Sequence, residues 1–190
     1  MRIFKFAVAI LAIALPTLPA QAENAVGIYC LIPVMEKIAK DASLVSFTDA
    51  QNGIIKKPQD TMSIEKEWEG LDENAEFSQK IFNNEISLKL KTIVAKNSYF
   101  DELFLTDHYG TIIAASNKTS DYFQADEDFF QHIITYGIGS VFITSSQPDK
   151  SAKSIGQKIA IPVTDKNVPI GVLTVITNTW YNEYFKACDK

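Results

Sequence analysis

Residues 100–130 decide the fold of this chain, and they read FDELFLTDHYGTIIAASNKTSDYFQADEDFF. Two short apolar runs, Glu102–Thr106 and Thr111–Ser116, flank a turn at His108-Tyr109-Gly110, and this pattern predicts a β-hairpin. A polar, aromatic and acidic segment follows and ends at Asp126-Glu127-Asp128. Such a segment adds little to a core, so its place beside a sheet indicates that it could hold a ligand.

The flanking sequence predicts helices before the hairpin and strands after it. Helices are expected over Asn24–Phe47, with Pro33 at its start or at a kink, from Ser63 onward, and over Asn84–Asn97, with a loop over Gln51–Asp60. After the hairpin we expect a short helix from Asp126 to Gly137, strands over Ser140–Ser145, Ile155–Thr164 and Pro169–Thr177, and a last helix over Asn178–Lys190. Five strands without long crossovers must pair mainly antiparallel, so the expected class is α+β with a five-stranded antiparallel sheet.

The first 22 residues have the pattern of a secretory signal peptide. Arg2 and Lys5 form a charged start, and the apolar run Phe6–Leu15 is shorter than the roughly 20 residues that span a bilayer. Ala20-Gln21-Ala22 has the small-x-small form of a cleavage site, so we expect export to a bacterial periplasm. An uncleaved N-terminal anchor is the alternative. Cleavage leaves 168 residues, enough for one domain made of a helical leader, residues 23–97, and a core, residues 98–190.

The net charge restricts the kinds of partner the chain can bind, and its two cysteines allow a disulfide. Loss of Arg2 and Lys5 takes the formal net charge from −5 to −7, which argues against nucleic acid or anionic lipid. Cys30 and Cys188 lie near the two ends of the mature chain, and in an oxidising compartment they could form a disulfide between the first and last helices. Two free thiols, or a disulfide with another chain, are the alternatives.

Three segments resemble the single Cache sensor domain, an extracytoplasmic relative of the PAS fold. Phe100–Asp107 with Gly110 is similar to the first hairpin of such domains, and Pro169–Val175 is similar to their final strand. Residues 119–127 resemble the TSDYxQxDE segment of a periplasmic, stand-alone subgroup, and residues 50–52 and 64–68 fit its helical leader more loosely. The resemblance covers most of Ser98–Asn178.

The resemblance implies a sensor that binds a small metabolite between one face of the sheet and the helices and loops that cover it. The signal would pass to the ectodomain of a membrane receptor or to a kinase, and a homodimer through the N-terminal helices is a further option. The alternative is a ligand-free interaction or scaffold module of the cell envelope. Trp68, Trp180 and Tyr181 are its candidate interface anchors, although burial in the core is the expected fate of the two tryptophans.

The ligand expected from these residues is neutral or cationic, such as an amine. In related pockets that bind amino acids, an Arg a few residues after a Tyr grips the carboxylate. Here Asp126 and Glu127 occupy the matching region, Arg2 is the only arginine, and no lysine lies between Lys118 and Lys150. Acids and aromatic rings suit a cation instead. The resemblance therefore implies these ligand-binding residues: Tyr122, Gln124, Asp126, Phe130, Phe142, Thr144 and Asp149.

Simpler roles compete with binding for the same residues. Asp126, Glu127 and Asp128 could cap the short helix, Phe129, Phe130 and Phe142 could belong to the core, Tyr122 could bury its ring, and Asp149 could be a turn residue.

No cofactor, metal site or enzymatic activity is expected. The acids at 121–128 could offer oxygen to Ca²⁺ but lack the alternating pattern of an EF-hand, and His108 and His132 stand apart from each other. No G-x-S-x-G or comparable nucleophile motif is present.

Overall fold

The computed structural model describes residues 28–54, 56–72 and 74–178. In it, the predicted hairpin forms the two strands at one end of the sheet. Strands β1 (Phe100–Asp107) and β2 (Ile112–Ala115) pair antiparallel, as predicted. Gly110 in the turn has a φ of 85°, and a Cβ there would lie 2.6 Å from the Cβ of Ala125. The turn therefore requires glycine, both for its backbone conformation and for the close approach of the segment that covers it.

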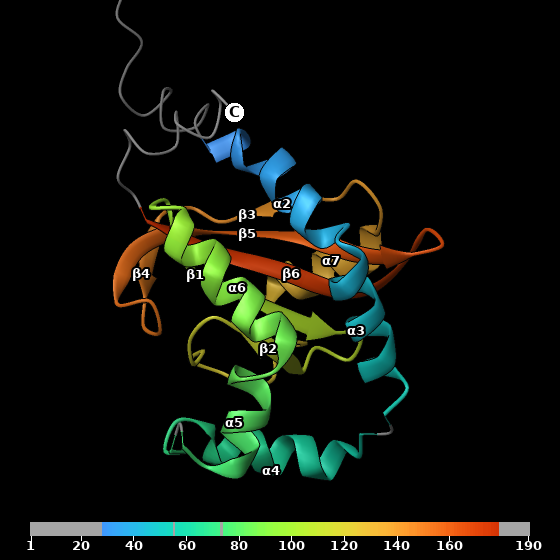
Figure 1. Cartoon of the computed structure of the whole chain (residues 1–190), viewed down its shortest axis with the longest axis vertical. Coiled ribbons are helices and arrows are strands. Elements are labelled where there is room, and N and C mark those ends of the chain that lie inside the picture. The colour runs from blue at the N-terminus through green and yellow to red at the C-terminus, as the bar shows by residue number, and fades with distance from the viewer. Residues whose placement is uncertain (1–27, 55, 73, 179–190) are drawn as a thin grey trace, which may run out of the picture.

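The remaining strands complete an antiparallel sheet in the order β2-β1-β6-β5-β3 (Figure 1). Their bounds are β3 (Phe142–Ile143), β4 (Gln147–Asp149), β5 (Ser154–Asp165) and β6 (Val168–Asn178). Lys166 and Asn167 have positive φ values of 46° and 69° and form the predicted turn between β5 and β6. This confirms the α+β class and the antiparallel sheet. The short strand β4, which pairs with β5 beside the main path, was not predicted and makes the sheet six-stranded.

Three helices cover one face of the sheet: α2 (Leu31–Ala39), α3 (Ala42–Asn52) and α6 (Glu85–Lys96). In Figure 1 they lie in front of the strands. The single helix expected over residues 24–47 is wrong, because the chain turns at Asp41. The Asp41 carboxylate accepts hydrogen bonds from Ser43 N (3.0 Å) and Leu44 N (3.4 Å), which begins α3 as a new helix. The helix predicted over Asn84–Asn97 is confirmed as α6, capped by Asn84.

Helices α4 (Pro58–Trp68) and α5 (Glu76–Phe82) lie below the sheet in Figure 1, near β2. The prediction that a helix begins at Ser63 is wrong. Pro58 begins it, because the fixed φ of proline suits the first turn of a helix. The loop expected over Gln51–Asp60 is shorter than predicted, because α3 extends to Asn52 and α4 begins at Pro58. Helix α5 was not predicted. Trp68 is fully buried, and its Nε1 donates to the carbonyl of Thr119 at 2.8 Å. The expected burial of Trp68 in the core is therefore confirmed, and it is not an interface anchor.

Two apolar clusters lie on opposite faces of the sheet. One joins α2, α3 and α6 to the sheet through residues such as Leu103, Leu105 and Leu173. The other joins α7 (Asp128–Tyr136), Trp68 and Tyr122 to the opposite face, which presents Phe104 and Ala160. The sheet is thus the middle of three layers.

The outer edge of β2 is closed by side chains and by a crossing segment. Ala115 N donates to Ser87 Oγ of α6 (3.0 Å), and Nδ2 of Asn84, the N-cap residue of α6, donates to the carbonyl of Ile113 (2.9 Å). Ile112 N donates to the carbonyl of Tyr122 at 3.0 Å.

Several predictions fall outside the described residues: the signal peptide at 1–22, the C-terminal helix, Trp180, Tyr181 and Cys188. Cys30 packs against the cluster under α2, and its disulfide with Cys188 stays a prediction. Within the three described ranges, no helix combines the length and apolar character needed to cross a bilayer.

Candidate functional site

The pairing of three strands places one acid and one lysine on the same face of the sheet. Glu102 of β1 lies opposite Ile176 of β6, and Ile176 lies opposite Lys158 of β5. Side chains of directly paired residues project from the same face, which here is the face covered by α7. The sequence analysis singled out neither Glu102 nor Lys158.

Glu102 is a buried carboxyl group without a partner. Its side chain belongs to a residue that is only 1% exposed, and neither carboxyl oxygen has a hydrogen-bond partner among the described residues. The nearby Ser151 hydroxyl donates instead to Asp149 Oδ1 (2.8 Å). Burial raises the pKa of Glu102 to about 8, and the charges of Asp149 and Asp101 add to this effect, while Ser151 and Lys158 oppose it. The carboxyl group is therefore mostly protonated at pH 7.

An open cleft of about 890 Å³ is lined by Lys158, Asp149 and Ser151, whereas Glu102 is not among its lining residues. We call it the sheet-face cleft. The same three residues are among those whose interactions affect the pKa of Glu102. The charged residues that line it are Glu65, Lys66, Glu69, Lys118, Asp121, Glu127, Asp149, Lys150, Lys153 and Lys158. Acids and lysines are thus mixed, whereas the sequence analysis expected acids alone.

Lys158 lies over an aromatic ring instead of pairing with an acid. Its Nζ is 4.5 Å from the centroid of Phe129 in α7, a geometry typical of a cation–π contact. The ion pairs within the described residues do not include Lys158 or Glu102. The cleft is therefore lined by a lysine that forms no ion pair with the described residues.

Asp149 lines this cleft, and it also stabilises its own turn. Its Oδ1 accepts from Ser151 Oγ (2.8 Å) and from Ala152 N (2.9 Å). No hydrogen bond of Oδ2 forms within the described part of the chain, so that oxygen remains able to accept from a bound molecule. Asp149 can therefore be a turn residue, as the simpler hypothesis states, and still bind a ligand through Oδ2.

Three other predicted residues lie in the layer that covers the hairpin. Tyr122 and Phe130 are each 5% exposed and belong to the apolar cluster under α7. The Tyr122 ring packs against Trp68, with centroids 5.3 Å apart, and burial raises the pKa of its phenol. Gln124 is buried and its Nε2 donates to the carbonyl of Asp121 (2.9 Å). Each of these residues has a structural role, whatever else it does.

Phe142 and Thr144 lie at the other side of α7, along β5. Phe142 of β3 is half-buried, and its ring centroid is 5.3 Å from that of His132. Thr144 Oγ1 accepts from Lys158 N at 2.8 Å. Thr144 thus fixes the backbone of Lys158, which lines the cleft.

Asp126 lies in a different hollow from Asp149. It is exposed and lines a groove of about 590 Å³ between α4 and the hairpin, together with apolar side chains such as Met62 and Phe123. The segment Tyr122–Phe123 is held there by Glu65, whose Oε2 accepts from both backbone amides (2.9 and 2.7 Å). The structure therefore separates two carboxylates that the sequence analysis placed together.

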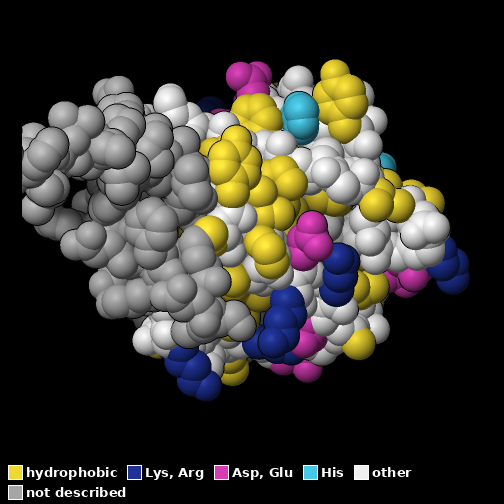
Figure 2. Space-filling model, turned by 90° about the horizontal axis from the view of Figure 1, so that it is seen from above, with side chains coloured by type: hydrophobic (Ala, Val, Ile, Leu, Met, Phe, Trp, Pro, Cys, Tyr) yellow, Lys and Arg dark blue, Asp and Glu magenta, His cyan; other side chains and the backbone are white. Residues whose placement is uncertain are grey.

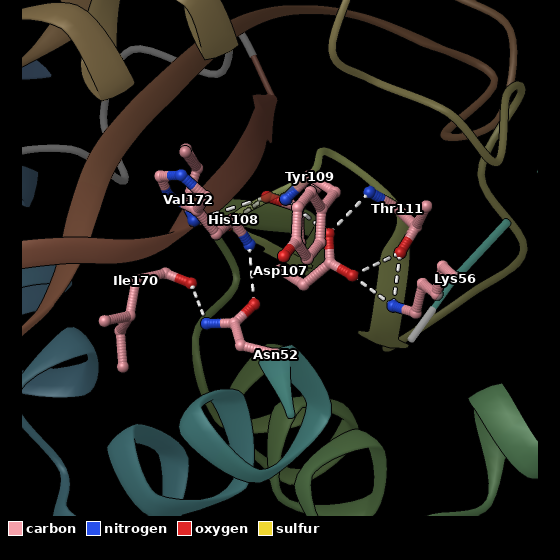
Figure 3. Close-up of polar contacts among 9 residues, drawn as sticks. Asn52, Lys56, Asp107, His108, Tyr109, Thr111, Ile170 and Val172 are labelled. Atoms are coloured by element: carbon pink, nitrogen blue, oxygen red, sulfur yellow. Dashed lines mark hydrogen bonds and ion pairs between the residues drawn. The ribbon is translucent and has the colours of Figure 1, made fainter. Parts of the chain in front are cut away.

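A polar network fixes this groove to the hairpin turn (Figure 3). The fully buried Asp107 accepts from Tyr109 N and Thr111 N, both at 2.9 Å, and forms an ion pair with Lys56. Asn52, at the end of α3, accepts from His108 N (2.9 Å) and donates to the carbonyl of Ile170 (2.7 Å). The network connects the turn, α3 and β6.

The acids at 126–128 do not act as predicted for a cap. Glu127 occupies the N-cap position of α7 but makes no capping hydrogen bond with its side chain, and Asp128 lies in the first turn, where it favours the helix dipole. Among the described residues, no group of three or more His, Cys, Asp or Glu is arranged to hold a metal ion.

The comparisons with known proteins concern structure only. No protein-family model matches the chain, and no curated protein is similar to its sequence. Similar solved structures include a domain of a sensory box/GGDEF family protein from Vibrio parahaemolyticus, with 9% identity and a TM-score of 0.49, covering 86% of this chain and 57% of that structure.

Two further similar structures are also parts of signalling proteins. The sensor domain of the V. cholerae histidine kinase DctB has 14% identity and a TM-score of 0.41, with 90% of this chain and 58% of that one covered. The ligand-binding domain of the Campylobacter jejuni chemoreceptor Tlp3, in complex with L-norvaline, has 16% identity and a TM-score of 0.43, with 90% and 63% covered. This chain thus spans less than two thirds of each structure, and at such identities no residue of their sites can be matched to one here.

Proposed function

We propose that this chain is a periplasmic sensor protein that binds a neutral or cationic metabolite and passes the signal to a membrane receptor or kinase. It acts by binding and not by catalysis. The ligand occupies the sheet-face cleft, with Asp149 as one polar anchor. The observation that supports this proposal is the open cleft of about 890 Å³ on the sheet, which Asp149 lines with a carboxylate oxygen free to accept a hydrogen bond.

Asp149 is the group in the cleft that favours this ligand class. Its Oδ1 is used within its own turn, whereas Oδ2 can accept a hydrogen bond from a ligand that carries N–H or O–H groups. A carboxylate ligand would be repelled by Asp149 and would have to be held by the lysines that also line the cleft.

A calorimetric screen of amines, neutral metabolites and carboxylates tests the proposal. We expect amines or neutral compounds to bind, and an Asp149→Asn variant to weaken amine binding about tenfold, because a charge-assisted hydrogen bond is lost. Asp126→Asn is the matched control, since Asp126 lines the other groove, and it should leave the affinity unchanged. Binding of carboxylates with no binding of amines would refute the proposal.

A second candidate function is that of an interaction module of the cell envelope. Large apolar side chains are exposed at Tyr29 (60%), Tyr136 (70%) and Ile138 (55%). Figure 2 shows apolar side chains gathered on the face seen from above, among scattered lysine and acidic residues. Contiguous exposed apolar surface is typical of an interface.

Size-exclusion chromatography with light scattering separates the two candidates. If the chain forms a dimer through the exposed side chain of Ile138, Ile138→Ser should shift it toward the monomer, whereas Ile155→Ser, at an exposed position on β5, should not. A monomer at all concentrations would exclude the homodimer and leave only a different partner for this surface.

A further inference from the structure

We propose that the groove between α4 and the hairpin is a second binding site, and that it takes a neutral aromatic molecule of about the size of indole. We call it the α4 groove. Of the residues that line the two hollows, Glu65 and Lys66 belong both to this groove and to the sheet-face cleft, and the others differ. The inference therefore concerns a different site and does not depend on the proposed function.

One face of α4 forms a wall of this groove. The helix contributes Pro58, Thr61, Met62, Glu65 and Lys66, which follow the i, i+3, i+4, i+7, i+8 spacing of a single helical face. The N-terminal half of this face carries the apolar side chains, and Met62 is 72% exposed. Helix α4 thus presents apolar surface to an open hollow as well as to the core.

Two aromatic rings add to the apolar lining. Tyr109 in the hairpin turn is 55% exposed, and Phe123 in the segment that crosses the hairpin is half-buried. With Pro58 and Met62 they give four apolar side chains around about 590 Å³, within the range of roughly 300–1,000 Å³ that is typical of small-molecule sites. Methionine is flexible and polarisable and packs well against aromatic rings, so this lining suits a flat aromatic ligand.

Polar contacts hold the walls of the groove together. Lys56, just before α4, forms an ion pair with Asp107 and donates to Thr111 Oγ1 at 2.6 Å (Figure 3). Glu65, near the other end of α4, accepts from the amide of Phe123. Both ends of the helical face are thus tied to the hairpin or to the segment that crosses it. A preformed groove lowers the entropy cost of binding a ligand.

The charges of the lining cancel. Two lysines, Lys56 and Lys66, balance two acids, Glu65 and Asp126, and the first of each pair is already engaged by the contacts above. Lys66 and Asp126 are exposed and form no ion pair within the described residues. A charged ligand would lose hydration without meeting an excess of opposite charge, whereas a neutral apolar ligand gains free energy by leaving water.

The size of the groove favours a small molecule over a protein partner. Ten residues line it, whereas each side of a stable protein interface takes roughly 20–30 residues. The occupant is therefore a compact molecule and not a second copy of the chain.

NMR of ¹³C-methyl-labelled methionine shows where indole binds. Apart from Met1, the chain has two methionines, and the second, Met35, is fully buried in the apolar cluster on the other face of the sheet. We expect indole to bind with a Kd of about 1 mM or below and to shift the methyl resonance of Met62 through its ring current, while that of Met35 stays unchanged. An unchanged Met62 resonance would refute the inference and leave the proposed function intact.

Variants measured by calorimetry check the location of the site. Met62→Gln should weaken indole binding about fivefold, because a polar group replaces an apolar one of similar length, and its exposure keeps the change from endangering the fold. Leu88→Gln, at an exposed position on α6, is the matched control and should leave the Kd unchanged. Equal affinities of Met62→Gln and Leu88→Gln would contradict the inference.

Two further comparisons separate this site from the proposed function. Asp149→Asn should leave indole binding unchanged, and weaker binding would place indole in the sheet-face cleft, which refutes the inference and supports the proposed function. Tryptamine and indole-3-acetate carry the same ring with a positive or a negative charge. Indole should shift Met62 at lower concentration than either, and tighter binding of a charged analogue in the α4 groove would overturn the neutral class.

Discussion

A glutamate inside a strand that is buried on both faces is costly unless it is neutral or paired. Glu102 shows the first solution: it lies among buried residues of β1 and keeps its proton. Asp107, five residues further along the same strand, shows the second: it is fully buried and ionically paired with Lys56, and it accepts hydrogen bonds from the turn. A buried carboxyl group is thus neutral at one end of β1 and paired with a lysine at the other.

The pH dependence of stability should report the state of Glu102. Its folded pKa, about 8, lies above its ordinary value of 4.5, so the folded state holds a proton that the unfolded state loses. The free energy of unfolding of the wild-type protein should therefore fall as pH rises from about 4.5 to about 8, by up to about 5 kcal/mol from this residue.

Urea unfolding of the wild-type protein and of Glu102→Gln at pH 5 and pH 8 measures this effect. The variant should gain stability relative to the wild type at pH 8 but much less at pH 5. Equal differences at the two pH values would show that Glu102 titrates normally.

Sequence alone could not have singled out this residue. In the run FDELFLTD, an acid before the apolar residues is the ordinary start of a half-exposed strand. Lys158 likewise looks like a solvent-facing residue of an alternating strand. Only the pairing of both strands with β6 places the two on one face, and register is not readable from composition.

At the scale of elements, a helix, strand or turn was predicted correctly where adjacent residues determine it. The hairpin, α6 and the turn at Lys166-Asn167 carry their instructions in adjacent residues, and all three were predicted. The break between α2 and α3 was missed because no Gly or Pro marks it. Asp41 starts the second helix with a side-chain bond that the apolar spacing does not reveal.

The ion pair between Lys56, in the loop before α4, and Asp107, at the end of β1, can be tested by mutation. Lys56→Met should lower the free energy of unfolding by about 3 kcal/mol, because it leaves the buried carboxylate of Asp107 without its cation. Lys57→Met is the matched control at an exposed neighbouring position and should change stability little.

Thermal or urea unfolding followed by circular dichroism checks this expectation. A loss in Lys56→Met no larger than in Lys57→Met would mean that Asp107 is satisfied by the turn amides alone.

At the scale of the whole molecule, the sheet joins two apolar clusters that share its strands. Leu103 and Phe104 are adjacent in β1 but belong to clusters on opposite faces. Neither cluster can lose its packing without disturbing the strands that support the other, so the described part of the chain should unfold in one step.

This cooperativity is measurable with Trp68 as a probe in a Trp180→Phe background. The fluorescence of Trp68 reports on the cluster under α7, while far-UV circular dichroism reports on all helices. The two urea transitions should coincide in midpoint and slope. A fluorescence transition at lower urea would show that the α7 side opens first.

The outer edge of β2 is already hydrogen-bonded, and this limits how other proteins can bind there. Ser87, Asn84 and the Tyr122 carbonyl already use the amides and carbonyls that a free border would present. A peptide therefore cannot add as a further strand at this edge. Edge-to-edge pairing of two molecules of this protein is prevented there for the same reason. Recognition at this rim must proceed through side chains.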